Sequence, residues 1–379
     1  MRNLANLALY SLVGLALGCG KGSGPQPVMR PPAGDTGSAT SAASSTALPT
    51  SQEKYTLAVS IYAGWMPWYY AKEQGITRKW AEKYGIEIET VYMDYVPSVE
   101  AFVAGQAQAC VMTNMEALNM PAASGIDSTA IIVGDYSNGN DAVLVRDNLA
   151  LKDITEAMLV ELTVSQYLLA RGLEMEGRSE KDVQLTNVSD SDIAATFLAD
   201  KSKKCVVTWN PMVLQIEQTP GITRIFDSAK IPGEIMDLCV VNTEVLKKDP
   251  RLGLALTGAW YEVLAVMSQR GPAADEAMEQ MAKLSGSSLT EYKTQLKTTA
   301  MFWTPEEAVN FTTGKEIQDA MEKVRQFSFA HGMFGQGATS VDAVGISFPD
   351  GTVQGDANKI KFRFTAEYME KAAKGEIAP

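Results

Sequence analysis

The chain has 379 residues, of which 46% are hydrophobic and 21% are charged. This length favours two domains, and the composition excludes a wholly disordered chain and a polytopic membrane protein. The net charge of −12 argues against nucleic acid or anionic lipid as the main partner. One histidine and four cysteines are too few for a His- or Cys-rich metal site, and they weigh against a conventional enzyme. We therefore expect no metal and no cofactor.

The N-terminus has the features of a secretion signal. Arg2 precedes a short apolar run over 7–17, which is too short to span a membrane and ends in small residues. Cys19 directly follows Gly18, an arrangement that resembles the lipobox of bacterial lipoproteins, whose cysteine carries the lipid. We predict a signal peptide over 1–18 and lipidation at Cys19, and the alternative is a plain cleaved signal peptide.

The next segment lacks the bulky apolar residues that a core requires. Residues 20–52 are built mainly from Gly, Ser, Pro, Ala and Thr, a composition typical of flexible tethers. We predict a lipid-anchored linker over 19–52 that holds a globular body in the aqueous space beside a bacterial membrane.

From Tyr55 onward, short β-branched runs alternate with amphipathic helical stretches. In chain order, the first block predicts strands at 55–63, 86–93, 109–115, 129–135 and 142–147, with helices at 67–75, 77–85, 97–106 and near 118–125. The second block predicts strands at 158–162, 182–188, 205–210 and 223–227, with helices at 164–177, 191–199 and 211–218. Cys110, Cys205 and Cys239 lie in apolar strand-like runs, so we expect buried free thiols and no disulfide framework.

The last third begins with a strand at 236–242 and is then mostly helical from 249 to about 332. A β-hairpin over 344–353 is predicted to turn at Asp350 and Gly351 and to be followed by a strand at 359–364. Capping boxes are predicted where Thr163 precedes Gln166 and where Thr304 precedes Glu307.

Alternating strands and helices predict an α/β fold with mostly parallel sheets, whose ligands lie at the carboxyl ends of strands. Two such blocks predict two lobes with a cleft between them. We place the crossovers near 141–142 and 234–237, so that lobe 1 comprises 55–141 and 237–379 and lobe 2 comprises 142–236.

The residues at the predicted strand ends are carboxylates, amides, hydroxyls and indoles, with almost no Arg, Lys or His. The ligand-binding candidates are Trp65, Trp68, Asn114, Glu116, Asp141, Glu161, Ser165, Trp209, Asn210 and Asp237. An anion site would instead use a bare helix N-terminus, hydroxyls and often a basic residue. Glu161 stands where the helix beginning at Thr163 offers its N–H groups, so its carboxylate would repel an anion. Carboxylates beside Trp faces suit a small planar cation.

Each candidate also has a structural alternative. Glu161 could cap its own helix, Trp65 and Trp68 could pack between the lobes, and Asp135 and Asp141 could order the loop over 136–141. Asn210 is expected to be an N-cap as well as a candidate ligand contact. The single histidine, His331, follows a long helix and is interpreted as a helix-end residue.

Several stretches resemble the periplasmic substrate-binding proteins of ATP-binding-cassette (ABC) importers, in the branch that binds aliphatic sulfonates, nitrate and taurine. The stretches are VSIYAGWMPWYYAKEQG, AFVAGQAQACVMTNMEAL, IIVGDYSNGND, VTWNP, IPGEIMDLCVVNTEVL, GAWYE and VRQFSFAHG. Within that branch the chain is similar to the subfamily associated with urea carboxylase, which is linked to urea and guanidine. Sulfonate and nitrate binders commonly have a small residue and hydroxyls where this chain has Glu161-Leu162-Thr163.

The resemblance implies a type II periplasmic-binding-protein fold with a helical C-terminal extension and no enzymatic activity. It implies a lipoprotein that captures guanidinium or urea and delivers it to the permease subunits of an ABC transporter. In that interpretation Trp65 and Trp209 sandwich the ligand, while Glu161, Asp237 and Glu116 accept its N–H groups. We expect a monomer. The alternatives are an anion binder for a sulfonate, taurine or nitrate, an enzyme related to thiamine-precursor synthases, and a sensor lipoprotein.

Overall fold

The computed structural model describes residues 53–377. The predicted signal peptide and the whole predicted linker, including Cys19, lie outside the described residues. Within 53–377, no helix is long and apolar enough to cross a membrane.

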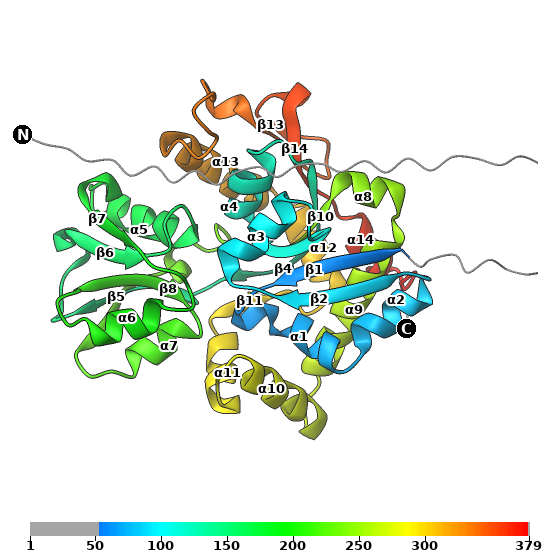
Figure 1. Ribbon diagram of the computed structural model, residues 1–379, viewed down its shortest axis with the longest axis horizontal. Helices are drawn as coiled ribbons and strands as arrows, with labels where there is room; N and C mark the ends of the chain where they lie inside the picture. Colours follow the sequence, from blue (N-terminus) through cyan, green and yellow to red (C-terminus); the bar gives the residue numbers. More distant parts are fainter. Residues whose placement is uncertain (1–52, 378–379) are drawn as a thin grey trace, which may run out of the picture. The chain divides into compact units, whose positions relative to one another are not determined.

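The first sheet forms the centre of what we call the first lobe (Figure 1). It has nine strands in the order β13-β12-β14-β4-β10-β3-β1-β2, with β11 paired to β4. Its strands are β1 (Lys54–Val59), β2 (Glu87–Tyr92), β3 (Ala109–Thr113), β4 (Ser128–Ser137), β10 (Met236–Asn242), β11 (Thr299–Met301), β12 (Gly345–Ser347), β13 (Val353–Gln354) and β14 (Ile360–Phe364). The antiparallel pair β12 and β13, whose connection contains Asp350, confirms the predicted C-terminal hairpin.

The second sheet forms the second lobe, drawn in green in Figure 1. Its five strands run in the order β7-β6-β8-β5-β9. They are β5 (Asp141–Arg146), β6 (Glu156–Leu159), β7 (Gln184–Asn187), β8 (Cys205–Trp209) and β9 (Ile222–Asp227). The chain passes between the two sheets twice, through residues 138–140 and through residues 228–235.

The α/β fold is confirmed, but the sheets are mixed, not mostly parallel as predicted. β10 runs antiparallel to both β3 and β4, and β5 runs antiparallel to both β8 and β9. Each of these strands follows the preceding strand without an intervening α-helix. In each case the preceding strand lies in the other sheet, so the chain enters its new sheet without the helical crossover that sets two neighbouring strands parallel.

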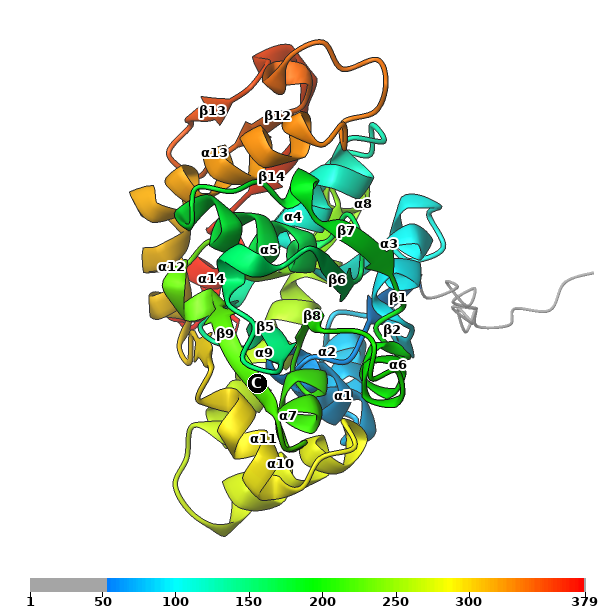
Figure 2. The same ribbon diagram turned by 90° about the vertical axis from the view of Figure 1, so that its left-hand side faces the viewer.

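Helices cover the faces of both sheets, and Figure 2 shows α5 and α7 with the second sheet. The first lobe carries α1 (Met66–Glu73), α2 (Ile76–Lys83), α3 (Tyr95–Val103), α4 (Asn114–Ala117), α8 (Thr243–Lys248), α9 (Arg251–Met267), α10 (Pro272–Leu284), α11 (Leu289–Leu296), α12 (Pro305–Thr312), α13 (Lys315–Ala330) and α14 (Glu367–Ala373). The second lobe carries α5 (Val164–Met175), α6 (Ile193–Ala199) and α7 (Met212–Glu217).

The alternation of side chains along β5 explains how the second sheet is buried on both faces. Val143 and Val145 belong to the large hydrophobic cluster that continues into the first lobe. Ala142 and Leu144 point the other way, into a smaller cluster with residues of α6 and α7. Because successive side chains of a strand point to opposite faces, one apolar run supplies both clusters.

Two local predictions can be checked directly. Cys110, Cys205 and Cys239 are buried and free, as predicted, and burial raises the pKa of each thiol. The capping box of Thr304 and Glu307 is present. The one predicted at Thr163 is not, because its hydroxyl oxygen accepts from the Ser165 N–H instead.

Candidate functional site

A small cavity lies where the two lobes meet, and we call it the inter-lobe cavity. Its volume is about 10 Å³, which is roughly the room that one water molecule requires. The lining residues come from both lobes and are Tyr62, Trp65, Tyr95, Thr113, Asp141, Val164, Trp209, Ile235 and Asp237. None of these side chains is basic.

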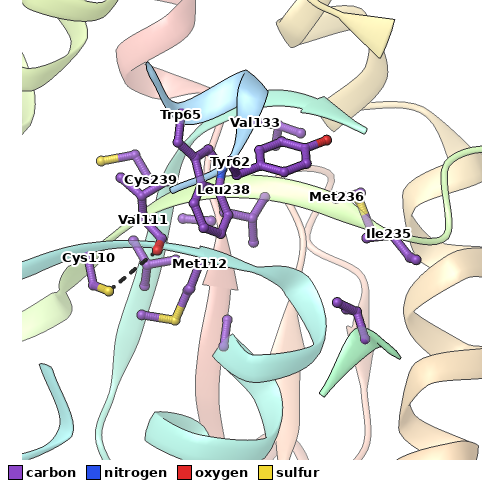
Figure 3. Packing of buried hydrophobic residues seen from close by; sticks show 14 of the residues in the cluster. Tyr62, Trp65, Cys110, Val111, Met112, Val133, Ile235, Met236, Leu238 and Cys239 are labelled. Atoms are coloured by element: carbon purple, nitrogen blue, oxygen red, sulfur yellow. Dashed lines mark hydrogen bonds between the residues drawn. The ribbon is translucent and has the colours of Figure 1, made fainter. Parts of the chain in front are cut away.

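Aromatic rings from both lobes form a continuous wall of this cavity. The Trp65 ring lies 5.1 Å from that of Tyr62 and 5.4 Å from that of Tyr95, measured between centroids. Tyr95 meets Trp209 of the second lobe edge to face at 5.7 Å, and the Trp209 Nε1–H donates to the Ile61 carbonyl at 3.3 Å. All of these rings are buried, and Figure 3 shows Tyr62 and Trp65 packed beside residues of β3 and β10. The wall is therefore a set of apolar faces with little freedom to move.

Buried aspartates supply the charge of the site. Asp237 is the second residue of β10 and the direct cross-strand partner of Asp135 in β4, and Asp141 begins β5. The Tyr62 hydroxyl donates to Asp135 Oδ1 at 3.4 Å, and the Asp141 N–H donates to the Ser137 hydroxyl at 3.1 Å. Burial raises the pKa of Asp135 and that of Asp141 to about 7, and it raises the pKa of Asp237 well above the usual range. The site thus holds acids that lack a fixed cationic partner.

The N-terminus of α5, where an anion could bind on this architecture, is already occupied by a protein carboxylate. Glu116 Oε1 accepts from the Val164 N–H at 3.0 Å, across the boundary between the lobes. Its Oε2 accepts from the Tyr95 hydroxyl at 2.7 Å and from the Thr113 hydroxyl. Burial raises the pKa of Glu116, while these hydrogen bonds act in the opposite direction. A carboxylate in this place excludes a second anion by charge repulsion.

Glu161 does not have the position expected for it. Its side chain is half-buried and does not line the inter-lobe cavity, and its backbone N–H donates to Asn187 Oδ1 at 2.9 Å. The expected carboxylate at the start of α5 is present, but it is Glu116, which reaches the helix from the other lobe.

Four further candidates lie close by without lining the cavity. Trp68 stacks on Trp260 at 5.0 Å. Asn114 uses its amide to fix the start of β10, since its Oδ1 accepts from the Met236 N–H at 2.9 Å. Ser165 is fully buried in the first turn of α5. Asn210 is not the expected N-cap, because Pro211 holds that position in α7; the Asn210 Oδ1 accepts from the Leu214 N–H at 3.0 Å.

The cavity also contains residues that the sequence analysis did not single out, namely Tyr95, Val164 and Ile235. Tyr95 opens α3, two residues before the helix was predicted to begin. Its position just after the end of β2 is a usable signal, because ligand-facing residues gather at that edge of a sheet.

A larger hollow of about 520 Å³ lies between α5 and α13. Its charged residues largely neutralise one another. Glu234 accepts from the Arg171 Nε at 2.9 Å and from Lys323, and it also accepts from Tyr167. His331 at the end of α13 bonds to Glu180 there and lies outside the inter-lobe cavity. We therefore place the candidate site in the inter-lobe cavity.

Sequence comparisons give no relative: no family model matches the chain, and neither does any curated protein. Solved structures do match. The periplasmic aliphatic sulphonate binding protein of Escherichia coli has 16% identity and a TM-score of 0.60, over 74% of this chain and 94% of that one. The alkanesulfonate-binding protein of Xanthomonas axonopodis pv. citri, bound to MOPS, has 12% identity and a TM-score of 0.62, over 76% and 97%.

The periplasmic nitrate-binding protein of Synechocystis PCC 6803 has 12% identity and a TM-score of 0.51, over 85% of this chain and 99% of that one. At these identities the similarity concerns the fold. The chain therefore has the α/β fold of periplasmic binding proteins, with the inter-lobe cavity between its two sheets.

Proposed function

We propose that this protein is an extracytoplasmic solute-binding protein of an ABC importer, and that its ligand is a small planar cation of the guanidinium type. The observation that carries the proposal is the lining of the inter-lobe cavity: aromatic faces with Asp141 and Asp237, and no basic residue. A buried carboxylate without a cationic partner is costly, and a cationic ligand would supply that partner.

In this proposal the two lobes contribute different contacts to the ligand. Trp65 from the first lobe and Trp209 from the second present ring faces, which bind a cation by about 0.5–2 kcal/mol each. Asp237 and Asp141, one from each sheet, accept its N–H groups, at about 1.5–3 kcal/mol for each charge-assisted hydrogen bond. A ligand that bridges the lobes stabilises the closed form, which the permease would recognise.

The rival ligand is an anion, as the sulfonate- and nitrate-binding structures suggest. Glu116 weighs against it, because this buried carboxylate accepts from the first N–H of α5. A cavity with room for about one water molecule must widen to admit either ligand, so its volume does not decide between them. Urea has the size and shape of guanidinium but no charge, so it would leave the aspartates without a counter-charge.

The proposal extends to the location of the protein. The signal peptide over 1–18 and the lipidated Cys19 would anchor it to a bacterial membrane on the periplasmic side, as a monomer that serves membrane-bound permease subunits. Support for this part comes from the sequence pattern and from the fold. Mass spectrometry of the N-terminal peptide from membrane-extracted protein tests the anchor, and an unmodified Cys19 contradicts it.

Calorimetric titration tests the ligand. Guanidinium, urea, taurine and nitrate are each titrated into the purified protein at low millimolar concentration, because guanidinium at molar concentration unfolds proteins. We expect saturable binding of guanidinium alone, and we expect Asp237→Asn to weaken it at least tenfold, as the loss of one charged hydrogen bond implies. Glu161→Gln is the matched control, since Glu161 lies outside the cavity, and it should bind as the wild type does. Saturable taurine or nitrate binding without guanidinium binding would refute the proposal.

A further inference from the structure

Of the cross-strand pair Asp135 and Asp237, only Asp237 is used in the proposed contacts with the ligand. Asp135 is left without a role. Asp237 lines both the inter-lobe cavity and a second, inner cavity of about 10 Å³, whereas Asp135 lines only the inner one. The two residues are direct partners on antiparallel strands β4 and β10. Side chains in such pairs lie about 5 Å apart at Cβ. Here both side chains are buried and line the same inner cavity, and Asp135 Oδ2 has no hydrogen-bond partner in the structure.

A hydrogen bond between two carboxyl groups requires a proton, because two carboxylates have only acceptors. We propose that Asp135 and Asp237 share one proton while the inter-lobe cavity is empty, and that a bound cation replaces this proton. In the exchange the O–H bond of the shared proton breaks, the proton passes to the solvent, and the cation takes its place. The total charge of the site is then the same before and after binding.

The surroundings favour the shared proton over two separate charges. The groups that face the pair are Tyr62 and Tyr292, which are neutral, and Asp141, which is acidic and has Glu116 nearby. No Lys, Arg or His lines either cavity. Gly64 packs so closely that a Cβ there would lie 2.6 Å from Asp135 Oδ2, which leaves no room for water on that side.

The shifted acidities agree with this geometry. Burial and the neighbouring charges raise the pKa of Asp135 to about 7 and that of Asp237 well above its usual range. Asp135 is thus a positioning residue: it does not touch the proposed ligand, but it sets whether Asp237 is charged when the ligand arrives. Like-charged carboxylates in contact commonly separate their pKa values in this way.

The inference rests on the proposed function for the identity of the cation, and one experiment separates the two. Infrared spectra of the ligand-free protein are recorded from pH 5 to pH 9, following the carbonyl stretch of a protonated carboxylic acid. We expect this band at pH 6 in the wild type, where Asp141 also contributes to it, and we expect guanidinium to remove the component that Asp135→Asn shifts. In Asp135→Asn, the pH midpoint at which this band disappears should fall by about one pH unit or more, because Asp237 no longer has a second carboxylate beside it. The control variant Glu161→Gln should leave the band at pH 6 and its pH midpoint as they are in the wild type.

A wild-type protein with no such band at pH 6, or an Asp135→Asn midpoint equal to that of the wild type, would overturn the shared proton whatever the ligand is. If calorimetry registers guanidinium binding while the component that Asp135→Asn shifts persists, the exchange is wrong and the proposed function stands. If the band and its shift are present but guanidinium does not bind, the proposed function and the exchange fail, while the shared proton is supported.

Discussion

Glu116 offers the sharpest test of how the lobes close, and we predict that Glu116→Gln weakens ligand binding. All three groups bonded to this carboxylate are donors: the Val164 N–H, the Tyr95 hydroxyl and the Thr113 hydroxyl. A glutamine is uncharged, and its oxygen can serve Val164 only if its NH₂ group donates to the two hydroxyls, which can also accept. The variant therefore loses the charge assistance of these buried hydrogen bonds.

The size of the effect follows from the bond that crosses between the lobes. A hydrogen bond to a charged group contributes about 1.5–3 kcal/mol. The bond from Val164 to Glu116 joins residues 48 positions apart on different lobes, so its weakening falls on the closed form. Because about 1.4 kcal/mol corresponds to a factor of ten, guanidinium affinity should fall by about 10- to 100-fold.

Calorimetric titration of guanidinium into Glu116→Gln and into the Glu161→Gln control measures this change. Circular dichroism establishes that both variants are folded before they are compared. A folded Glu116→Gln protein that binds guanidinium within twofold of the wild type would refute our account of the closed form.

Two further predictions concern stability. Because burial raises the pKa of Asp135 and Asp141 from 3.8 to about 7, their protonation stabilises the folded, ligand-free protein; this contribution is fully present below pH 4 and is lost as the pH rises through 7. Thermal unfolding of the ligand-free protein should therefore show a lower midpoint at pH 8 than at pH 6, and an equal or higher one contradicts the assigned burial. Gly258→Ala should destabilise the fold by about 1–3 kcal/mol or more, since a Cβ there would lie 2.3 Å from the ring of Trp80. Thermal unfolding of this variant is compared with that of the control Gly337→Ala, whose added Cβ would have no atom within 4 Å. Equal unfolding midpoints for the two variants would show that α9 shifts freely to admit the new Cβ.

Periodicity and turn chemistry were sufficient to predict most elements of the fold. The run at 236–242 was predicted as a strand with the bounds that the structure has, and the hairpin near Asp350 follows from its Asp-Gly turn. The direction of β5 and β10 was not predictable from alternation, because each follows a strand of the other sheet and no helical crossover joins it to a neighbour that precedes it directly.

The candidate site was predictable where it depends on strand ends. The inter-lobe cavity is lined by Trp65, which follows β1, by Asp141 and Asp237 at the starts of β5 and β10, and by Trp209 at the end of β8. The exchange of roles between Glu161 and Glu116 was not predictable. A residue beside a helix in sequence is an obvious capping candidate, whereas the residue that caps α5 reaches it only through the packing of one lobe on the other.

The measurement that tests the central claim most directly is a crystal structure of the protein grown with low-millimolar guanidinium chloride. Our account predicts the guanidinium in the inter-lobe cavity, with its plane against Trp65 or Trp209 and its nitrogens within hydrogen-bonding distance of Asp237 and Asp141. An empty cavity with guanidinium elsewhere, or a chloride ion at the N-terminus of α5 with Glu116 displaced, would contradict it.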